Sequence, residues 1–146
     1  MGYTHYWETK KQISKAKWKK ISSLVERLAM NDGGQVLCRE YDRTDEPVHI
    51  DGDMIAFNGK GPHGHETFWL ERKEGWAFCK TARKPYDEFV TAVLCITWWH
   101  AGDCIDVSSD GWDDDWRRGL ELAQSVDPTV EIPTGVESWP DKKAGT

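Results

Sequence analysis

The sequence predicts a single α+β domain with a mostly antiparallel sheet and about three helices packed on one face. A chain of 146 residues with 38% hydrophobic residues is long enough to bury one core. Segments with strand character follow one another through the middle of the chain, and only three segments have helical character. This grouping favours an antiparallel sheet over an alternating βαβ arrangement.

The first third of the chain is expected to form a strand, a helix and a second strand. Residues 2–7, GYTHYW, are rich in aromatic and Thr residues, as strands are. Ser14 can cap a helix that continues to about Met30, where NDGG supplies residues that tolerate a positive φ. Apolar residues recur on one face of this helix at Trp18, Ile21, Val25 and Leu28. Residues 35–41, QVLCREY, give the second strand.

The middle of the chain is expected to form two antiparallel pairs of strands. Residues 48–50 and 54–59 make the first pair, joined by a DGD turn. A glycine-rich loop, KGPHGH, covers residues 60–65. Residues 66–72 and 75–81 then make a second pair joined through KEG.

The last helices differ in character. Pro85 suits the first position of a helix, and residues 86–100 are apolar nearly all round, so this helix should be the most buried. A strand over residues 104–109 follows. Asp110 is then expected to cap a last helix over about 112–124.

Composition predicts the boundaries of the domain, its cellular location and the state of its cysteines. We expect the domain to cover residues 1–124 and an irregular tail with three prolines to cover 125–146. The first residues lack the apolar segment of a signal peptide, and no apolar run approaches the ~20 residues of a membrane span. We therefore expect a cytoplasmic protein without a membrane partner. The cysteines lie in apolar runs and form no C-x-x-C pair, which predicts buried free thiols at Cys38, Cys79, Cys95 and Cys104.

A cluster of cations in mid-chain is the first candidate for function. The net charge is −6, yet Lys80, Arg83 and Lys84 fall within five positions just before the apolar helix. Fixed positive charge at such a junction suits a phosphate or another anion. The alternative is that these cations pair with nearby surface carboxylates, those of Glu66, Asp87 and Glu88.

Aromatic and polar residues would complete a pocket around Lys80 and Arg83. Nine tryptophans are unusual for this length, and some should line a surface or a stacking site. We expect stacking or polar contacts from the first strand, namely His5, Tyr6 and Trp7. Further polar lining is expected from Asn58, His65, Thr67 and Tyr86.

Other chemistries have weaker support in the sequence. His5, His63 and His65 could serve a phosphodiesterase-like hydrolase, but no signature of a hydrolase accompanies them. The acids from Asp110 to Asp115 could mimic phosphates, although a helix start explains them equally. The HGH stretch is the only closely spaced pair of metal ligands, so we predict neither a metal site nor a cofactor. The lysines of residues 10–20 are spread around their helix, so a nucleic-acid partner is not expected.

Several of these stretches carry a family resemblance. MGYTHYW, FNG, HETF, FCKTARKPYD and SSDGWDDDW resemble recurrent motifs in a family of small uncharacterised proteins encoded by tailed phages, prophages and some bacteria. The resemblance spans roughly residues 1–124. It implies an accessory role, such as that of inhibitors of host enzymes or of sponges for the nucleotide signals of bacterial immunity.

The sequence-based hypothesis is therefore a counter-defence protein that acts in the cytoplasm of a bacterial host. It would bind and sequester a small nucleotide-like anion and would not be an enzyme. Two alternatives stay open at this point: an inhibitor that binds a host defence enzyme through a Trp-rich or acidic surface, and the hydrolase. Homo-oligomerisation is compatible with all three.

Overall fold

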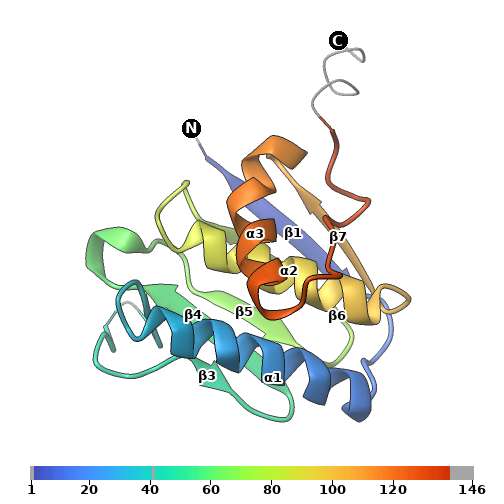
Figure 1. The fold of residues 1–146 in the computed structure, drawn as a ribbon, viewed down its shortest axis with the longest axis horizontal. Helices are drawn as coiled ribbons and strands as arrows, with labels where there is room; N and C mark the ends of the chain where they lie inside the picture. The colour runs from blue at the N-terminus through green and yellow to red at the C-terminus, as the bar shows by residue number, and fades with distance from the viewer. Residues whose placement is uncertain (1, 41, 139–146) are drawn as a thin grey trace.

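Two antiparallel sheets and three α-helices make up the computed structural model, which describes residues 2–40 and 42–138 (Figure 1). The first sheet has the strand order β6-β1-β7. In the second sheet β4 lies between β2 and β3, and β4 also pairs with β5. The predicted α+β class is confirmed.

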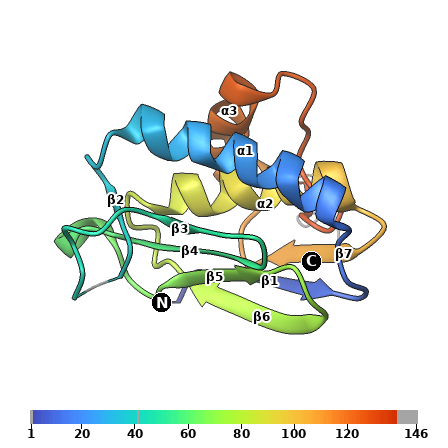
Figure 2. The same cartoon turned by 90° about the horizontal axis from the view of Figure 1, so that it is seen from below.

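The strands have the following bounds: β1 Thr4–Thr9, β2 Leu37–Cys38, β3 His49–Ile50, β4 Met54–Gly59, β5 Phe68–Glu71, β6 Gly75–Lys80 and β7 Ile105–Ser109. The α-helices are α1 Lys15–Asp32, α2 Asp87–Ala101 and α3 Arg117–Val126, with short 3₁₀ turns at Gly61–His63 and Asp113–Trp116. Figure 2 shows the helices on one side of the strands, whereas β1 and β6 form the opposite side of the molecule.

Helix α1 begins and ends where the sequence predicts. The Ser14 hydroxyl accepts a hydrogen bond from the Lys17 amide at 3.2 Å, and so caps the first turn. Gly33 ends the helix at a φ of 60°, in the left-handed region that glycine adopts without strain. The buried face contains Trp18, Ile21, Leu24, Val25 and Leu28.

Helix α2 is the buried centre of the fold, as predicted. Every residue from 89 to 97 is buried, including two threonines. Their hydroxyls are satisfied within the helix, because Thr91 donates to the Asp87 carbonyl and Thr97 to the Val93 carbonyl. Helix α3 packs against α2 through Gly119, where any side chain would collide with Thr91.

The predicted pairing of residues 66–72 with 75–81 is wrong. Strand β5 pairs with β4, and β6 pairs with β1 along its whole length. The aromatic core explains this choice, because Phe68 of β5 packs 5.0 Å from both Trp7 and Phe57, measured between ring centroids. Burial of these rings outweighs the short connection between the two strands.

Two smaller expectations also fail. Asp110 does not cap the last helix, because its carboxylate accepts hydrogen bonds from the Thr4 amide and the Tyr6 hydroxyl. The second strand is only Leu37–Cys38 among the described residues, and the Asp32 carboxylate accepts hydrogen bonds from the Val36 and Leu37 amides at its start. Tyr41, the last residue of the predicted strand, lies outside the described residues.

The segment after α3 has no helix or strand in its described part, up to residue 138, yet Val130 and Val136 are buried in the core. The remaining residues of the predicted tail, 139–146, lie outside the described residues. All four cysteines are free and buried, as predicted. None of the helices in the described part of the chain combines the length and apolar character that a bilayer span requires.

Candidate functional site

The turn between β6 and α2 holds the predicted cation cluster in a strained backbone. Ala82 and Arg83 have φ values of 53° and 58°, a region that residues other than glycine rarely adopt. This turn places the Arg83 guanidinium 3.9 Å from the centroid of the Tyr3 ring and 3.0 Å from Asp115 Oδ1. Arg83 is thus engaged by a ring and a carboxylate, and its partner is Asp115 rather than the neighbouring acids that the sequence suggested.

The other two cations of the cluster do not converge with Arg83. Both Lys80 and Lys84 are exposed. Lys80 lies in register with Thr4 at the end of β6. Its main chain is bound by Glu66, whose carboxylate accepts from the Lys80 amide at 2.8 Å and whose amide donates to the Lys80 carbonyl at 3.3 Å.

His5 lies behind the turn, on the inner face of β1, and is completely buried. Its Nδ1 is 2.8 Å from Ser109 Oγ and its Nε2 is 2.7 Å from Asp87 Oδ1. Ser109 Oγ also accepts from the Gly111 amide and from Trp116 Nε1. Because both of its lone pairs are then occupied, the Ser109 hydroxyl donates to Nδ1, and Nε2–H donates to Asp87.

This Asp–His–Ser chain has the residue types of a hydrolytic triad, but both nitrogens of its imidazole are used within the fold. Asp87 Oδ1 accepts a second hydrogen bond, from the Thr81 hydroxyl at 2.6 Å. The rings of Tyr3 and Trp116 pack edge-on against His5, each at 5.0 Å between centroids. A substrate therefore has no path to the imidazole, and the network ties β1, β7 and the start of α2 together.

Asn58 and Tyr86 hold the loop of residues 60–67 in place. Asn58 is 1% exposed, donates to the His65 carbonyl and the Thr67 hydroxyl, and accepts from the amides of Gly59 and His65. The buried Tyr86 hydroxyl donates to the Glu66 carbonyl, and burial raises the pKa of this phenol. The side chain of His65 is exposed, and the bonds named above join it to Asn58 through its main chain only.

Trp7 packs in the core, whereas Tyr6, its neighbour on β1, points to the other face of the sheet. The structure therefore divides the predicted residues between four places. His5, Trp7, Asn58 and Tyr86 point inward, Arg83 lies on the turn, and Lys80 and Tyr6 lie on the outer face of the first sheet. His65 and Thr67 lie in the loop before β5. A ligand-binding role stays a prediction for each of them.

The outer face of the β6-β1-β7 sheet carries an exposed group of rings that we call the aromatic platform: Tyr6, Trp76 and Phe78. Trp76 is 61% exposed and Phe78 is 50% exposed. Tyr6 and Trp76 are stacked with 6.5 Å between centroids, and Trp76 and Phe78 are 5.4 Å apart. The helices lie on the other side of this sheet, so they leave the platform uncovered (Figure 2).

Charged residues flank the aromatic platform at opposite ends. Lys80 lies on the same face of β6 as Trp76 and Phe78, because it is two residues beyond Phe78 along the strand. Glu8 and Asp106 lie toward the other end, where a cavity of about 400 Å³ opens beside Tyr6 and Trp76. The Asp106 carboxylate is 3.2 Å from Lys10 Nζ. Burial and the hydrogen bond to Asp110 raise the pKa of Tyr6, so its hydroxyl stays a donor.

Sequence reasoning missed Trp76 and Phe78, although the signal was present. Residues 75–81 were expected to be a strand, and Trp76, Phe78 and Lys80 alternate along it. Alternation alone places these three side chains on one face.

Comparisons of the chain with protein-family models, with curated protein sequences and with solved structures found no match. Within residues 2–40 and 42–138, no group of three or more His, Cys, Asp or Glu side chains is arranged to hold a metal ion. The functional argument therefore rests on the geometry of the aromatic platform and its flanking charges.

Proposed function

We propose that the protein binds and sequesters a small, planar, anionic ligand of the nucleotide class on the aromatic platform. The observation that carries the proposal is the exposure of Trp76 and Phe78 side by side on a sheet face that none of the helices in the described part of the chain covers. Leaving such rings in water forgoes the free energy of burial, about 25 cal/mol per Å² of apolar surface. Contiguous exposed apolar side chains of this kind mark binding surfaces.

The chemistry of the surface fits a nucleotide in three parts. Exposed aromatic rings stack on the face of any base, which contributes about 1–3 kcal/mol per base. Lys80 offers a charge-assisted hydrogen bond to a phosphate at one end. Glu8 and Asp106 at the other end can accept hydrogen bonds from ribose hydroxyls or from a base amino group.

Capture without turnover is the mode that we propose. His5 is buried on the opposite face of the sheet, and both of its ring nitrogens are engaged by Ser109 and Asp87. Together with the family resemblance, this supports a role as a phage-encoded counter-defence protein in the cytoplasm of the bacterial host.

The proposal is tested by thermal unfolding with cyclic and linear nucleotides and ADP-ribose. A ligand at 100 times its Kd should stabilise the protein by about 2.7 kcal/mol. The ligand should be recovered unchanged by chromatography after the protein is heat-denatured. Recovery of a cleaved product would contradict sequestration, and the absence of a shift with every compound would contradict the ligand class.

Lys80→Ala and Lys84→Ala form a matched pair for this assay. Both side chains are exposed lysines of the same segment, but only Lys80 lies on the outer sheet face. Lys80→Ala should weaken the binding of a phosphorylated ligand by about 1.5–3 kcal/mol and leave that of the free nucleoside unchanged. Equal effects of the two variants would remove Lys80 from the proposed site.

A second candidate function uses the same surface. Trp and Phe side chains beside acidic residues also suit a protein interface, in which a few buried aromatics contribute most of the binding energy. A host enzyme that is inhibited by the protein and by Trp69→Ala, but not by Trp76→Ala, would favour an inhibitor over a nucleotide-binding protein. Trp69 is the matched control because it is 41% exposed but belongs to the other sheet.

A further inference from the structure

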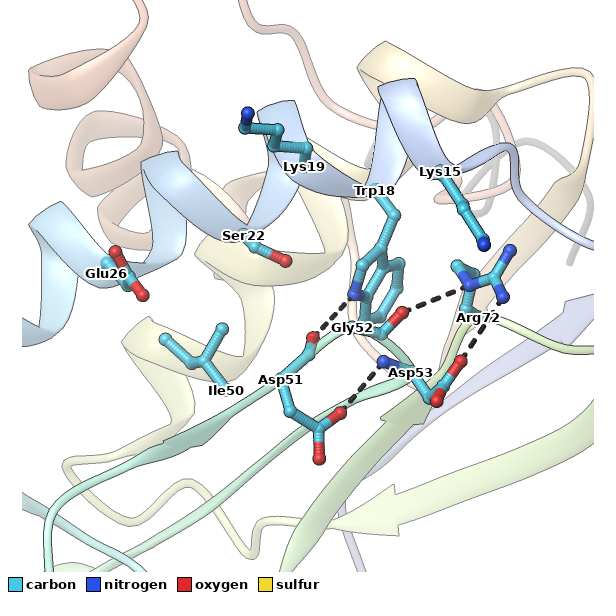
Figure 3. Close-up of a pocket in the computed structure, with 10 residues that line it drawn as sticks. All are labelled: Lys15, Trp18, Lys19, Ser22, Glu26, Ile50, Asp51, Gly52, Asp53 and Arg72. Atoms are coloured by element: carbon cyan, nitrogen blue, oxygen red, sulfur yellow. Dashed lines mark hydrogen bonds and ion pairs between the residues drawn. The ribbon is translucent and has the colours of Figure 1, made fainter.

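Two cavities of the molecule differ in the charge of their walls. A cavity of about 640 Å³ lies between α1 and the turn that joins β3 to β4 (Figure 3). The charges of its lining balance, because three cations stand against three carboxylates: Lys15, Lys19, Arg72, Glu26, Asp51 and Asp53. The cavity of about 400 Å³ beside the aromatic platform has only two charged residues in its lining, Glu8 and Asp106, and both are acidic. This second cavity therefore favours a ligand that presents hydrogen-bond donors to it.

The strand register brings Glu8 beside the exposed ring of Trp76. Glu8 lies two residues beyond Tyr6 on β1 and so on the same outer face of the sheet. It is directly opposite Trp76 of β6 on one side and Asp106 of β7 on the other. The Cβ atoms of residues paired in this way are about 5 Å apart. The Glu8 carboxylate can therefore reach the edge of a base that stacks on Trp76.

The Glu8 carboxylate is available to a ligand. Like charges directly opposite each other, such as Glu8 and Asp106, destabilise a sheet. Lys10 neutralises Asp106, with its Nζ 3.2 Å from Asp106 Oδ1. Within residues 2–40 and 42–138, the exposed Glu8 side chain has neither an ion pair nor a hydrogen bond. The acceptor positions of its two oxygens are therefore open, and a donor from a ligand would offset the repulsion by Asp106.

The order of the groups along the platform assigns Glu8 to the base of a nucleotide. Lys80 lies four residues beyond Trp76 on β6, which is about 13 Å along the strand. When Lys80 binds the phosphate and Trp76 stacks on the base, the ribose lies between them, over Phe78. Glu8 is in register with Trp76, at the end that is remote from the phosphate. Its hydrogen bonds therefore go to the base and not to the ribose.

We propose that Glu8 selects guanine as the base of the ligand on the aromatic platform, an inference that rests on the proposed function. An ionised carboxylate only accepts hydrogen bonds. Guanine presents two adjacent donors, N1–H and N2–H, on one edge and so binds both oxygens of Glu8. Adenine, cytosine and uracil place a ring nitrogen or a carbonyl oxygen beside their donor, and the negative charge of Glu8 repels these acceptors.

The proposal is tested by calorimetry with the 5′-monophosphates of guanosine, inosine and adenosine (GMP, IMP and AMP). GMP should bind at least about tenfold more tightly than AMP. IMP keeps N1–H but lacks the amino group, so its affinity should fall between the two. In Glu8→Gln the affinities for GMP and AMP should come within about twofold of each other, because an amide offers a donor as well as an acceptor.

The ratio of the GMP and AMP affinities is the readout, since the loss of a negative charge strengthens the binding of every phosphorylated ligand. Glu121→Gln is the matched control. It removes the same charge from an exposed position on α3 and should keep the ratio of the unaltered protein. Glu8 is exposed, so its replacement should leave the fold intact, and an unchanged Tm of the free variant verifies this.

Equal affinities for GMP and AMP, a preference for AMP, or an unchanged ratio in Glu8→Gln would overturn the assignment of guanine and leave nucleotide binding on the platform standing. No binding of any of the three compounds would overturn it as well. The proposed function fails with it only if the wider panel of cyclic and linear nucleotides also gives no thermal shift.

Discussion

The turn between β6 and α2 and the aromatic platform adjoin each other on β6, yet they use their side chains in opposite ways. Behind the turn, the buried His5 ring binds Ser109 and Asp87 and leaves neither of its nitrogens for a ligand. On the platform, Trp76 and Phe78 are half exposed or more. The region of the turn has the residue types that are common in catalytic sites, whereas the platform has the surface that a ligand can reach.

The difference separates residues that stabilise the fold from residues that are available to bind. A polar side chain in a buried network stabilises the fold most when all of its hydrogen bonds are made within the protein. Such a side chain then has no donor or acceptor left to bind a ligand. An exposed aromatic ring adds little to the stability of the fold. Its presence on the surface is better explained by a binding partner that covers it.

The largest effect is expected in thiol labelling behind the turn. Burial raises the pKa of Cys79 to about 12, and the Cys79 thiol is completely buried. Labelling requires the structure to open at a cost of several kcal/mol, so the native rate should fall at least ~10³-fold below the rate in urea. Mass spectrometry of the labelled peptide measures both rates. Comparable rates would show that the region behind the turn is open.

His5→Ala should produce the largest change in stability. It removes a buried ring and deprives Ser109 and Asp87 of one hydrogen bond each, which together should lower the free energy of unfolding by about 3 kcal/mol or more. Urea denaturation measures the loss. His65→Ala is the matched control and should change it by less than about 0.5 kcal/mol, because that side chain is exposed. A small loss for His5→Ala would mean that the network contributes little and that His5 is available for function.

Arg83→Ala should have an intermediate effect. It removes the cation–π contact with Tyr3 and an ion pair of which the Arg83 side chain is 61% exposed, so the loss should be about 1 kcal/mol. Lys84→Ala should leave stability unchanged in the same denaturation experiment. If Arg83→Ala left stability intact but abolished ligand binding, the turn and not the platform would be the binding site.

Ala82→Gly should have the smallest effect, and its sign is informative. Glycine adopts the φ of 53° without strain, which offsets the greater flexibility that it gives the unfolded chain, so the protein should be stabilised by up to about 0.5 kcal/mol. Ala29→Gly, within α1, should instead destabilise it by about 1 kcal/mol. Thermal unfolding distinguishes the two signs. A destabilised Ala82→Gly variant would argue against strain in the turn.

The elements that depend on local signals could be predicted from the sequence. Ser14 and Gly33 set the ends of α1, and the all-round apolar composition of residues 86–100 predicted the burial of α2. The pairing of β6 with β1 could not be predicted in this way. It brings together strands about 70 residues apart in the chain, and its stability comes from rings such as Trp7 and Phe68 that meet only in the folded protein.

The site was only partly predictable for a similar reason. His5 and Asn58 were chosen for their chemistry, but hydrogen-bonding capacity does not reveal whether the fold itself uses it. The alternation of residues along β6 does predict that Trp76, Phe78 and Lys80 lie on one face of the strand. The sequence cannot show that the three helices of the described residues leave that face open, because this follows from their packing on the other side of the sheet (Figure 2).

The most direct test of the platform is the ratio of nucleotide affinities in Trp76→Ala and Arg83→Ala, measured by calorimetry with the compound that gives the largest thermal shift. Our account predicts that Trp76→Ala weakens binding by about 1–3 kcal/mol, or roughly 5- to 150-fold, while Arg83→Ala and Trp69→Ala remain within about twofold of the unaltered protein. Full affinity in Trp76→Ala combined with a loss in Arg83→Ala would contradict the account and would place the ligand at the turn.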